Sequence, residues 1–196
     1  MARRASFPPA GPAAPDGAAS VRLRVLSPQA SQLHEHLARL DDGDRRVRLG
    51  RSVAPTAVEA YCTRARVADP LIVGGFVDGR LVASAELFAL PDEPFGVGRA
   101  APMADLLMAI EPSHRGRGLA VRLARELIRH GASRRIALVR MEYDPANTPM
   151  ARVSARLGAV HNRSGRRVRA ELCTGWISDG LVPPLTERRA GYRPLV

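Results

Sequence analysis

The feature that most constrains the fold is a junction near the middle of the chain, where an apolar segment, a glycine-containing turn and a long helical pattern follow one another. MADLLMAI (103–110) is typical of a largely buried strand, and apolar residues recur along one face of residues 119–132, as in an amphipathic helix. A helix start leaves backbone N–H groups without partners and carries a partial positive charge, so it can hold an anion that approaches closely. Gly116 and Gly118 allow that approach, and the arginines of HRGRG (114–118) suit a pyrophosphate. The junction therefore predicts a phosphate-binding turn.

Two common phosphate-binding motifs do not fit this turn. A Walker A loop needs a Gly-Lys pair, and the chain contains no lysine. A dinucleotide fingerprint needs a third glycine at the position that Val121 occupies. A solvated glycine turn would explain the letters RGRG alone, but not their place between a buried strand and a long helix.

Hydrophobic periodicity along the rest of the chain predicts an α/β (α+β) domain, a mixed sheet with helices on its faces. Asp78-Gly79 is the pair that a type I′ hairpin turn prefers, and Thr56 with Glu59 has the spacing of a helix capping box. The expected strands are 21–25, 71–77, 80–90, 103–110 and 136–143, with a closing hairpin of 159–163 and 166–172; the expected helices are 29–40, 57–67, 119–132 and 149–157; and 41–46 and 91–102 are expected loops.

Length and composition favour one domain and an anionic partner. The chain has 196 residues, 45% of them apolar, so we expect one core over 21–172, between a disordered tail at 1–20 and a C-terminal extension at 173–196. Its 30 basic residues, all arginine, give a net charge of +11, which attracts anions in general. An aromatic content of 4% leaves little for base stacking and argues against nucleic acid.

Cysteine and histidine spacing indicates no metal site. Cys62 and Cys173 form no CxxC pair, and His34 and His36 are two residues apart on a predicted helix, so we expect buried thiols, solvated histidines and no bound metal. No apolar run is long enough to cross a bilayer, and the N-terminus lacks the apolar core of a signal peptide. We therefore expect a cytoplasmic protein with no membrane partner.

At the glycine turn the chain resembles the GNAT superfamily of N-acetyltransferases. Arg115, Gly118 and Ala120 match the family's acetyl-CoA loop, in which Gln or Arg is followed after two residues by Gly and after one more by Gly or Ala. NTPMARVSARLGA (147–159) is similar to the segment after the family's fifth strand. The resemblance implies a GNAT-like, mainly antiparallel central sheet and acetyl-CoA as acyl donor, with no metal. It also implies N-acetyl transfer by direct attack of a primary amine from a small molecule or a protein lysine, in a monomer or homodimer. Bacterial protein-lysine acetyltransferase domains are the most similar members.

The resemblance assigns the coenzyme to backbone groups of the strand and the turn. Met108, Ala109 and Ile110 would bond the pantetheine arm, and the Met108 amide would donate to the oxyanion of the tetrahedral intermediate. Asn147 would contact the pantetheine or cap the following helix. The amides that would cradle the pyrophosphate belong to Arg115, Gly116, Arg117, Gly118, Leu119 and Ala120.

Acetyl transfer needs a base, because an amine is almost wholly protonated at pH 7. Asp105 is the one polar residue of strand 103–110, burial raises the pKa of a carboxyl group toward a useful range, and family members often carry a glutamate base at this position. A water-bridged or purely structural aspartate is the alternative. Glu86 is the second candidate, although a solvent-facing strand residue is the favoured interpretation there. Glu142 is a third acidic position and is equally suited to pairing with an arginine.

The departing thiolate of CoA needs a proton. Many family members use a tyrosine four residues before the glycine that ends the second motif, and Ser154 stands there in this chain, so water and Tyr143 are alternative donors. Arginines in 37–51 and 160–169, segments that set specificity in the family, point to an acidic acceptor or protein surface. Two other functions stay open: a non-catalytic acyl-CoA-binding module of the same fold, and a basic nucleic-acid-binding protein.

Overall fold

The computed structural model describes residues 20–49, 54–90, 94–95, 99–100 and 102–175. The tail expected at 1–20 and the extension expected at 173–196 lie almost wholly outside these residues. In chain order the described elements are β1 (Arg22–Leu26), α1 (Ser31–Ala38), α2 (Asp42–Leu49), α3 (Pro55–Ala68), β2 (Leu71–Val77), β3 (Arg80–Leu90), β4 (Pro94–Phe95), β5 (Arg99–Ala100), β6 (Met103–Ile110), a 3₁₀ turn (Pro112–His114), α4 (Leu119–Ser133), β7 (Leu138–Tyr143), α5 (Thr148–Leu157), β8 (Val160–Ser164) and β9 (Arg167–Cys173).

Seven strands form one mixed sheet in the order β1-β2-β3-β6-β7-β9-β8, and β4 pairs with β5 separately. Every neighbouring pair of the large sheet is antiparallel except β6 and β7, which are parallel. The expected α/β fold class and mainly antiparallel sheet are therefore confirmed.

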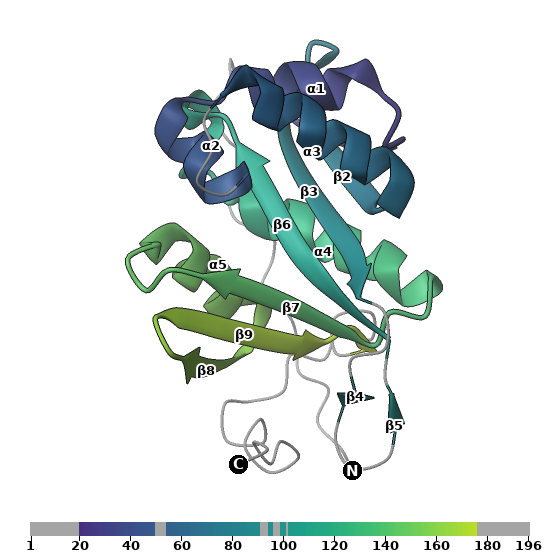
Figure 1. The fold of residues 1–196 in the computed structure, drawn as a ribbon, viewed down its shortest axis with the longest axis vertical. Helices are drawn as coiled ribbons and strands as arrows, with labels where there is room; N and C mark the ends of the chain where they lie inside the picture. Colours follow the sequence, from purple (N-terminus) through teal and green to yellow (C-terminus); the bar gives the residue numbers. More distant parts are fainter. Residues whose placement is uncertain (1–19, 50–53, 91–93, 96–98, 101, 176–196) are drawn as a thin grey trace, which may run out of the picture.

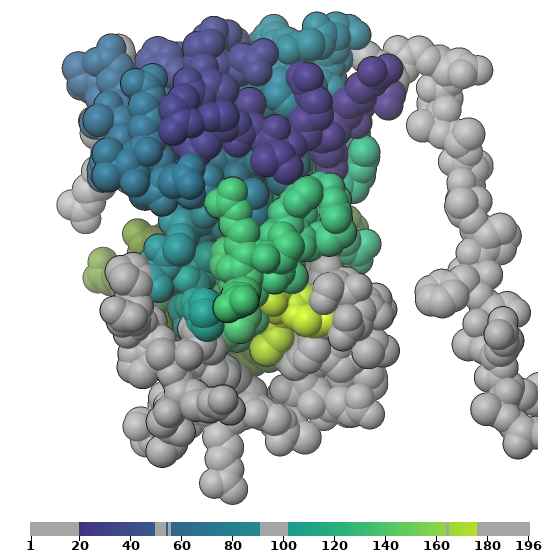
Figure 2. All heavy atoms as spheres, turned by 90° about the vertical axis from the view of Figure 1, so that its right-hand side faces the viewer, coloured from purple at the N-terminus to yellow at the C-terminus, as the bar shows by residue number. Residues whose placement is uncertain are grey.

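Helices cover both faces of this sheet (Figure 1). On what we call the front face, α1, α2 and α3 lie over the half formed by β1, β2, β3 and β6, while α4 and α5 lie behind the sheet. Figure 2 shows the molecule turned by 90°, with the purple residues of β1 and α1 above the green residues of α4. None of the described helices is long and apolar enough to cross a membrane.

Alternation along β3 separates two cores. Ala85 and Leu87 face α4 and belong to the larger apolar cluster, whereas Ser84 and Glu86 face the front helices. On α4, Leu123, Leu127 and Ile128 are fully buried against the sheet, and each contributes about 2 kcal/mol by leaving water. This packing fixes α4, and with it the turn that begins the helix.

Local turn chemistry agrees with the sequence in some places and differs in others. Asp78 and Gly79 both have positive φ (48° and 80°), as a type I′ turn requires. The capping box expected from Thr56 does not form, because α3 begins at Pro55, two residues before the expected start at 57, with Ala54 as its N-cap.

Two expected loops contain regular structure. The segment 41–46 belongs largely to α2, because Asp41 caps the helix by accepting a bond from the Asp44 amide at 2.8 Å. The segment 91–102 contains the β4–β5 pair. Both were expected as loops because neither carries an apolar period.

Candidate active site

The parallel strands β6 and β7 form a fork. Residues Met103–Asp105 of β6 pair with Leu138–Arg140 of β7. Beyond Asp105 and Arg140, β6 pairs with β3 alone and β7 pairs with β9 alone. Figure 1 shows the two strands diverging. Residues 106–110, including Met108, Ala109 and Ile110, therefore have one backbone edge outside the sheet ladder. The β3–β6 register is continuous, so it is the loss of the β7 partner, and not a bulge against β3, that opens this edge.

The free end of β6 leads directly into the glycine turn. Gly116 and Gly118 have φ values of 77° and 73°, a conformation that favours glycine. A Cβ atom at either position would meet nothing within 4 Å, so the space outside the turn is open. Gly118 is the N-cap of α4, and no described side chain caps the helix. The amides of Leu119 and Ala120 thus begin a helix at an accessible, uncapped end, which fits a phosphate group.

Arg115 has a different role from the one its charge suggests. Its Nε donates to the carbonyl of Ile110 at 2.8 Å, and its Nη2 pairs with Asp44 of α2. The guanidinium therefore ties the turn to the strand end and to α2. Arg117 is exposed as well, so the turn presents its charge to solvent beside the ion-paired Arg115.

Glu111, between β6 and the turn, ties the same region to α1 and β3. Arg39 Nε and Arg80 Nη2 each donate to it at 2.9 Å, and His36 Nδ1 lies 3.3 Å from its Oε1. Burial acts to raise the pKa of Glu111, but these donors and the arginine charges hold it below its usual value. His36 is fully buried, which corrects the expectation of a solvated side chain, and burial lowers its pKa.

Asp105 lies at the base of the fork, as the last residue of β6 that pairs with β7. Arg140 Nε donates to its Oδ1 at 2.7 Å, and Arg140 Nη2 donates to its Oδ2 at 3.1 Å. The Asp105 side chain is 32% exposed, so the burial expected from its apolar strand is not found. The bidentate pair instead fixes the carboxylate on the front face, where water can reach it.

Glu86 is fully buried, which corrects the favoured expectation of a solvent-facing residue. It lies on the front face, opposite Leu107 in the free part of β6. Tyr61 of α3 donates to its Oε2, Ser84 donates to its Oε1 at 3.2 Å, and Arg48 Nη2 lies 2.5 Å from Oε1. Three elements therefore converge on one carboxylate.

This cluster consists of a charged guanidinium and a neutral phenol around Glu86. Burial raises the pKa of Tyr61 far above its usual value, with Glu86 adding to the effect and Arg48 opposing it. Burial alone would lower the pKa of Arg48, but the charge of Glu86 and the phenol of Tyr61 raise it overall. Tyr61 is thus a hydrogen-bond donor here, and Arg48 carries its charge into the protein interior.

Ser154, at the position of the family's tyrosine, is buried among three partners. Its hydroxyl donates to the Ala151 carbonyl at 3.0 Å, and it lies 3.0 Å from the Tyr143 hydroxyl and 2.8 Å from His161 Nε2. Burial lowers the pKa of His161. The fold therefore places Tyr143 in contact with Ser154, as the alternative proton donor would require.

The remaining candidates have local partners. Asn147 caps α5, its Oδ1 accepting from the Met150 amide at 3.1 Å, and the pantetheine contact stays a prediction. Glu142 pairs with Arg169 at the surface, at 3.1 Å from Nε and 2.9 Å from Nη2.

Among the described residues, no group of three or more His, Cys, Asp or Glu side chains could hold a metal ion. Cys62 is buried and Cys173 half-buried; both are free, and burial raises the pKa of both thiols.

Sequence reasoning did not identify Arg48, Tyr61, Arg140 or His161. One usable signal existed for the helix that carries Arg48. The segment of α2 has aspartates in its first turn and arginines in its last, the distribution that the helix dipole favours. Pairing of Arg140 with Asp105 depends on a parallel register, which no local pattern indicates.

Comparisons with known proteins agree with this geometry. Residues 35–159 match the model of the acetyltransferase (GNAT) family. No curated protein matches the chain in sequence. Among solved structures, the GNAT domain of an S. lividans PAT is similar at 20% identity and a TM-score of 0.63, covering 78% of this chain and 90% of that one. A putative acetyltransferase from Salmonella typhimurium, solved with its cofactor acetyl-CoA, is 15% identical with a TM-score of 0.57 and coverages of 79% and 94%. An aminoglycoside N-acetyltransferase in complex with CoA is 21% identical with a TM-score of 0.58 and coverages of 74% and 93%. The match over residues 35–159 shows that the chain belongs to the GNAT acetyltransferase family.

Proposed function

We propose that this protein is an acetyl-CoA-dependent N-acetyltransferase in which a primary amine attacks the thioester directly, without a covalent enzyme intermediate. The observation that carries the proposal is the continuity of two features: the open edge of β6 at 106–110 runs directly into the uncapped helix start at Gly118. An amide-containing arm that ends in a pyrophosphate matches this arrangement of strand edge and helix amides.

The donor would be held mainly by main-chain groups. Met108, Ala109 and Ile110 would bond the pantetheine arm along the open edge, and the Met108 amide would stabilise the oxyanion. The amides of 115–120 would hold the pyrophosphate, with Arg117 supplying formal charge. Asn147 would support the arm from the start of α5, where its side chain already fixes the helix.

Two carboxylates on the front face would serve the amine. Glu86 lies beside the free part of β6 and would bind the amine and take its proton. Asp105, at the base of the fork and 32% exposed, would pass the proton to solvent through water. On the other side of the transfer, the Ser154 hydroxyl and its Tyr143 partner would protonate the thiolate, which is itself a tolerable leaving group.

The decisive experiment is thiol release from acetyl-CoA with a panel of primary amines, including lysine derivatives. Asp105→Asn and Glu86→Gln should each lower the rate by about 10² or more, the usual contribution of a general base. Glu126→Gln, which breaks an ion pair on the outer surface of α4, is the matched control. If acetyl-CoA raises the melting temperature but no amine releases thiol, the chain is a binding module of the same fold and the catalytic proposal fails.

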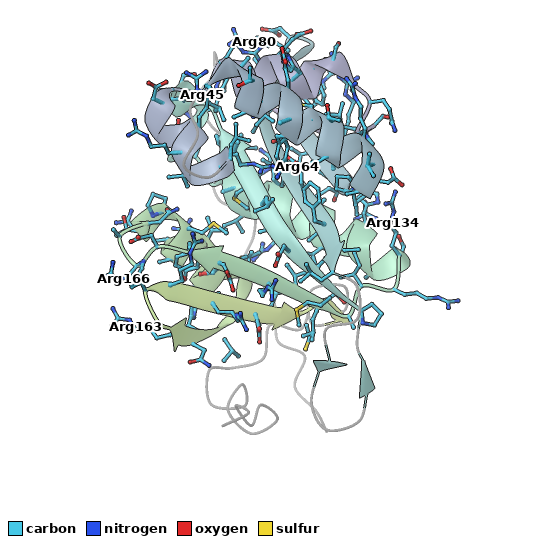
Figure 3. All side chains as sticks on the ribbon, in the orientation of Figure 1. Arg45, Arg64, Arg80, Arg134, Arg163 and Arg166 are labelled. Carbon is cyan, nitrogen blue, oxygen red and sulfur yellow. The ribbon has the colours of Figure 1, made fainter. Side chains whose placement is uncertain are left out.

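The distribution of arginine favours a small anionic donor over nucleic acid. Figure 3 places Arg45 on α2, Arg134 at the end of α4, and Arg163 with Arg166 at the β8–β9 turn. These four side chains lie on different sides of the molecule, Arg64 lies on α3, and the arginines labelled in Figure 3 form no single stripe. We therefore expect no DNA or RNA binding at moderate salt, which filter binding at two salt concentrations would check.

A further inference from the structure

Helix α2 is attached to the protein in an unusual way. Its one buried residue is charged: Arg48, whose side chain is 3% exposed, whereas of its two apolar residues Val47 is 74% exposed and Leu49 is only partly buried against the front apolar cluster. A helix normally buries apolar residues and leaves its charges in water. The burial of Arg48 therefore calls for an explanation in terms of what its guanidinium contacts.

The guanidinium occupies a site that is built for a cation. It bonds the Glu86 carboxylate and the Tyr61 hydroxyl, each at 2.5 Å, and its carbon lies 4.5 Å from the centre of the Tyr61 ring. Ser84 adds a hydroxyl beside the carboxylate. A carboxylate, an aromatic face and hydroxyl groups are the groups that recognise an ammonium ion in a protein.

Arg48 fits this site incompletely. Its Nε and Nη1 are buried and have no hydrogen-bond partner within the part of the chain that the structure describes. Unpaired buried donors are uncommon in folded proteins and carry a cost in stability. A compact ammonium would use the same carboxylate and ring without stranding two further donors.

The site is also next to the proposed reaction. Glu86 is opposite Leu107 and Ser84 is opposite Ala109, both in the free part of β6, so the cluster lies on the front of the strand that would carry the thioester. The N-terminal part of α2 is tied to the glycine turn by the pair between Asp44 and Arg115. Helix α2 thus connects the donor turn at one point and the cation site at another.

We propose that Arg48 occupies the subsite of the acceptor's ammonium group, and that the acceptor is a primary amine on an unbranched chain, of the lysine side-chain class, which displaces it. The inference rests on the proposed function. Arginine keeps its proton and is not a nucleophile under these conditions, so the resident cation is not consumed. A displacing ammonium would lose one proton to Glu86; its nitrogen then forms the C–N bond to the acetyl carbon while the C–S bond breaks. The thiolate takes up a proton, and the net products are an amide, CoA thiol and one released proton.

A chain without lysine offers a direct test. Arg48→Lys introduces a single lysine into the cation site, and Arg46→Lys places one on the exposed face of the same helix. With acetyl-CoA, mass spectrometry should find the lysine introduced at 48 acetylated at least about tenfold faster than the one at 46, at a rate independent of protein concentration, because the step is intramolecular. Equal rates, or faster modification at 46, would overturn the proposal.

A second variant covers the case in which Arg48→Lys fails to fold. Arg48→Gln vacates the site, and the KM for Nα-acetyl-lysine amide should fall severalfold while calorimetry gives an unchanged Kd for acetyl-CoA. A raised or unchanged KM in a folded Arg48→Gln protein would refute the displacement. Failure of the proposed function looks different, since the unaltered protein would then release no thiol with any amine.

Discussion

The glycine at the start of α4 gives the sharpest test of where the donor binds. Gly118 has φ of 73°, and a Cβ added there would meet nothing within 4 Å. Any side chain therefore brings the same backbone strain, about 1–2 kcal/mol, without a clash. Gly118→Ala carries that strain alone, whereas Gly118→Glu adds a negative charge where the pyrophosphate should lie, so the difference between the two variants isolates the electrostatic effect.

The expected size follows from linkage and Coulomb's law. With acetyl-CoA at 100 times its Kd, binding stabilises the folded state by about 2.7 kcal/mol, which for a chain of this length raises Tm by roughly 5–10 °C. A unit charge at 4 Å costs about 4 kcal/mol near a protein surface, or about three orders of magnitude in Kd. Gly118→Glu should then leave a shift below roughly 1 °C.

Differential scanning fluorimetry with and without acetyl-CoA is sufficient as the assay. Gly118→Ala should keep most of the ligand-induced shift from a lower starting Tm. If Gly118→Glu shows the same shift as Gly118→Ala, the phosphates do not lie at this helix start, and the assignment of the donor to the turn is wrong.

Two further predictions concern the ties around the turn. Asp44→Asn breaks the partly exposed pair with Arg115, so unfolding in urea should show a loss of at most about 1 kcal/mol. Because α2 carries Arg48 into the proposed amine subsite, a less firmly held helix should lower the KM for the amine and leave the acetyl-CoA KM within about twofold. An unchanged amine KM with an altered acetyl-CoA KM would contradict a role of this pair in placing α2. Burial lowers the pKa of His36 below its usual 6.5, so near and below pH 6.5 the unfolded chain binds a proton that the folded protein does not bind. The free energy of unfolding should therefore fall as pH drops below 6.5, by at most about 1.4 kcal/mol per pH unit. That slope should be reduced in His36→Gln and retained in the half-exposed control His34→Gln in urea titrations, and equal slopes would show that another group is responsible.

Much of the fold could be predicted because its signals are local. The bounds expected for the strands 71–77, 80–90 and 103–110 are those of β2, β3 and β6, since each is a dense apolar run bounded on at least one side by a turn residue or a proline. The glycine turn could also be predicted, because Gly116 and Gly118 stand directly between an apolar strand and an amphipathic helix. Helix α2 was missed because its stability comes from a cap and from charge placement, and it has almost no apolar face.

The surroundings of the two acidic candidates could not be predicted, because they depend on contacts between distant segments. A solvent-facing Glu86 was the favoured expectation, but the residue is fully buried by Tyr61 and Arg48, which reach it from two separate helices. The apolar neighbours of Asp105 in sequence predict a buried side chain, but Asp105 lies where β6 stops pairing with β7, and its side chain is partly exposed. A strand's composition gives its average environment, whereas contacts with distant segments decide the environment of each single residue.

The short parallel pairing has a mechanical consequence. The sheet consists of two halves, β1-β2-β3-β6 and β7-β9-β8, which are joined by only three residue pairs between β6 and β7. A donor lying between the unpaired edges of β6 and β7 would connect the two halves and make the loaded protein stiffer than the empty one. Each round of transfer would then form and break that connection.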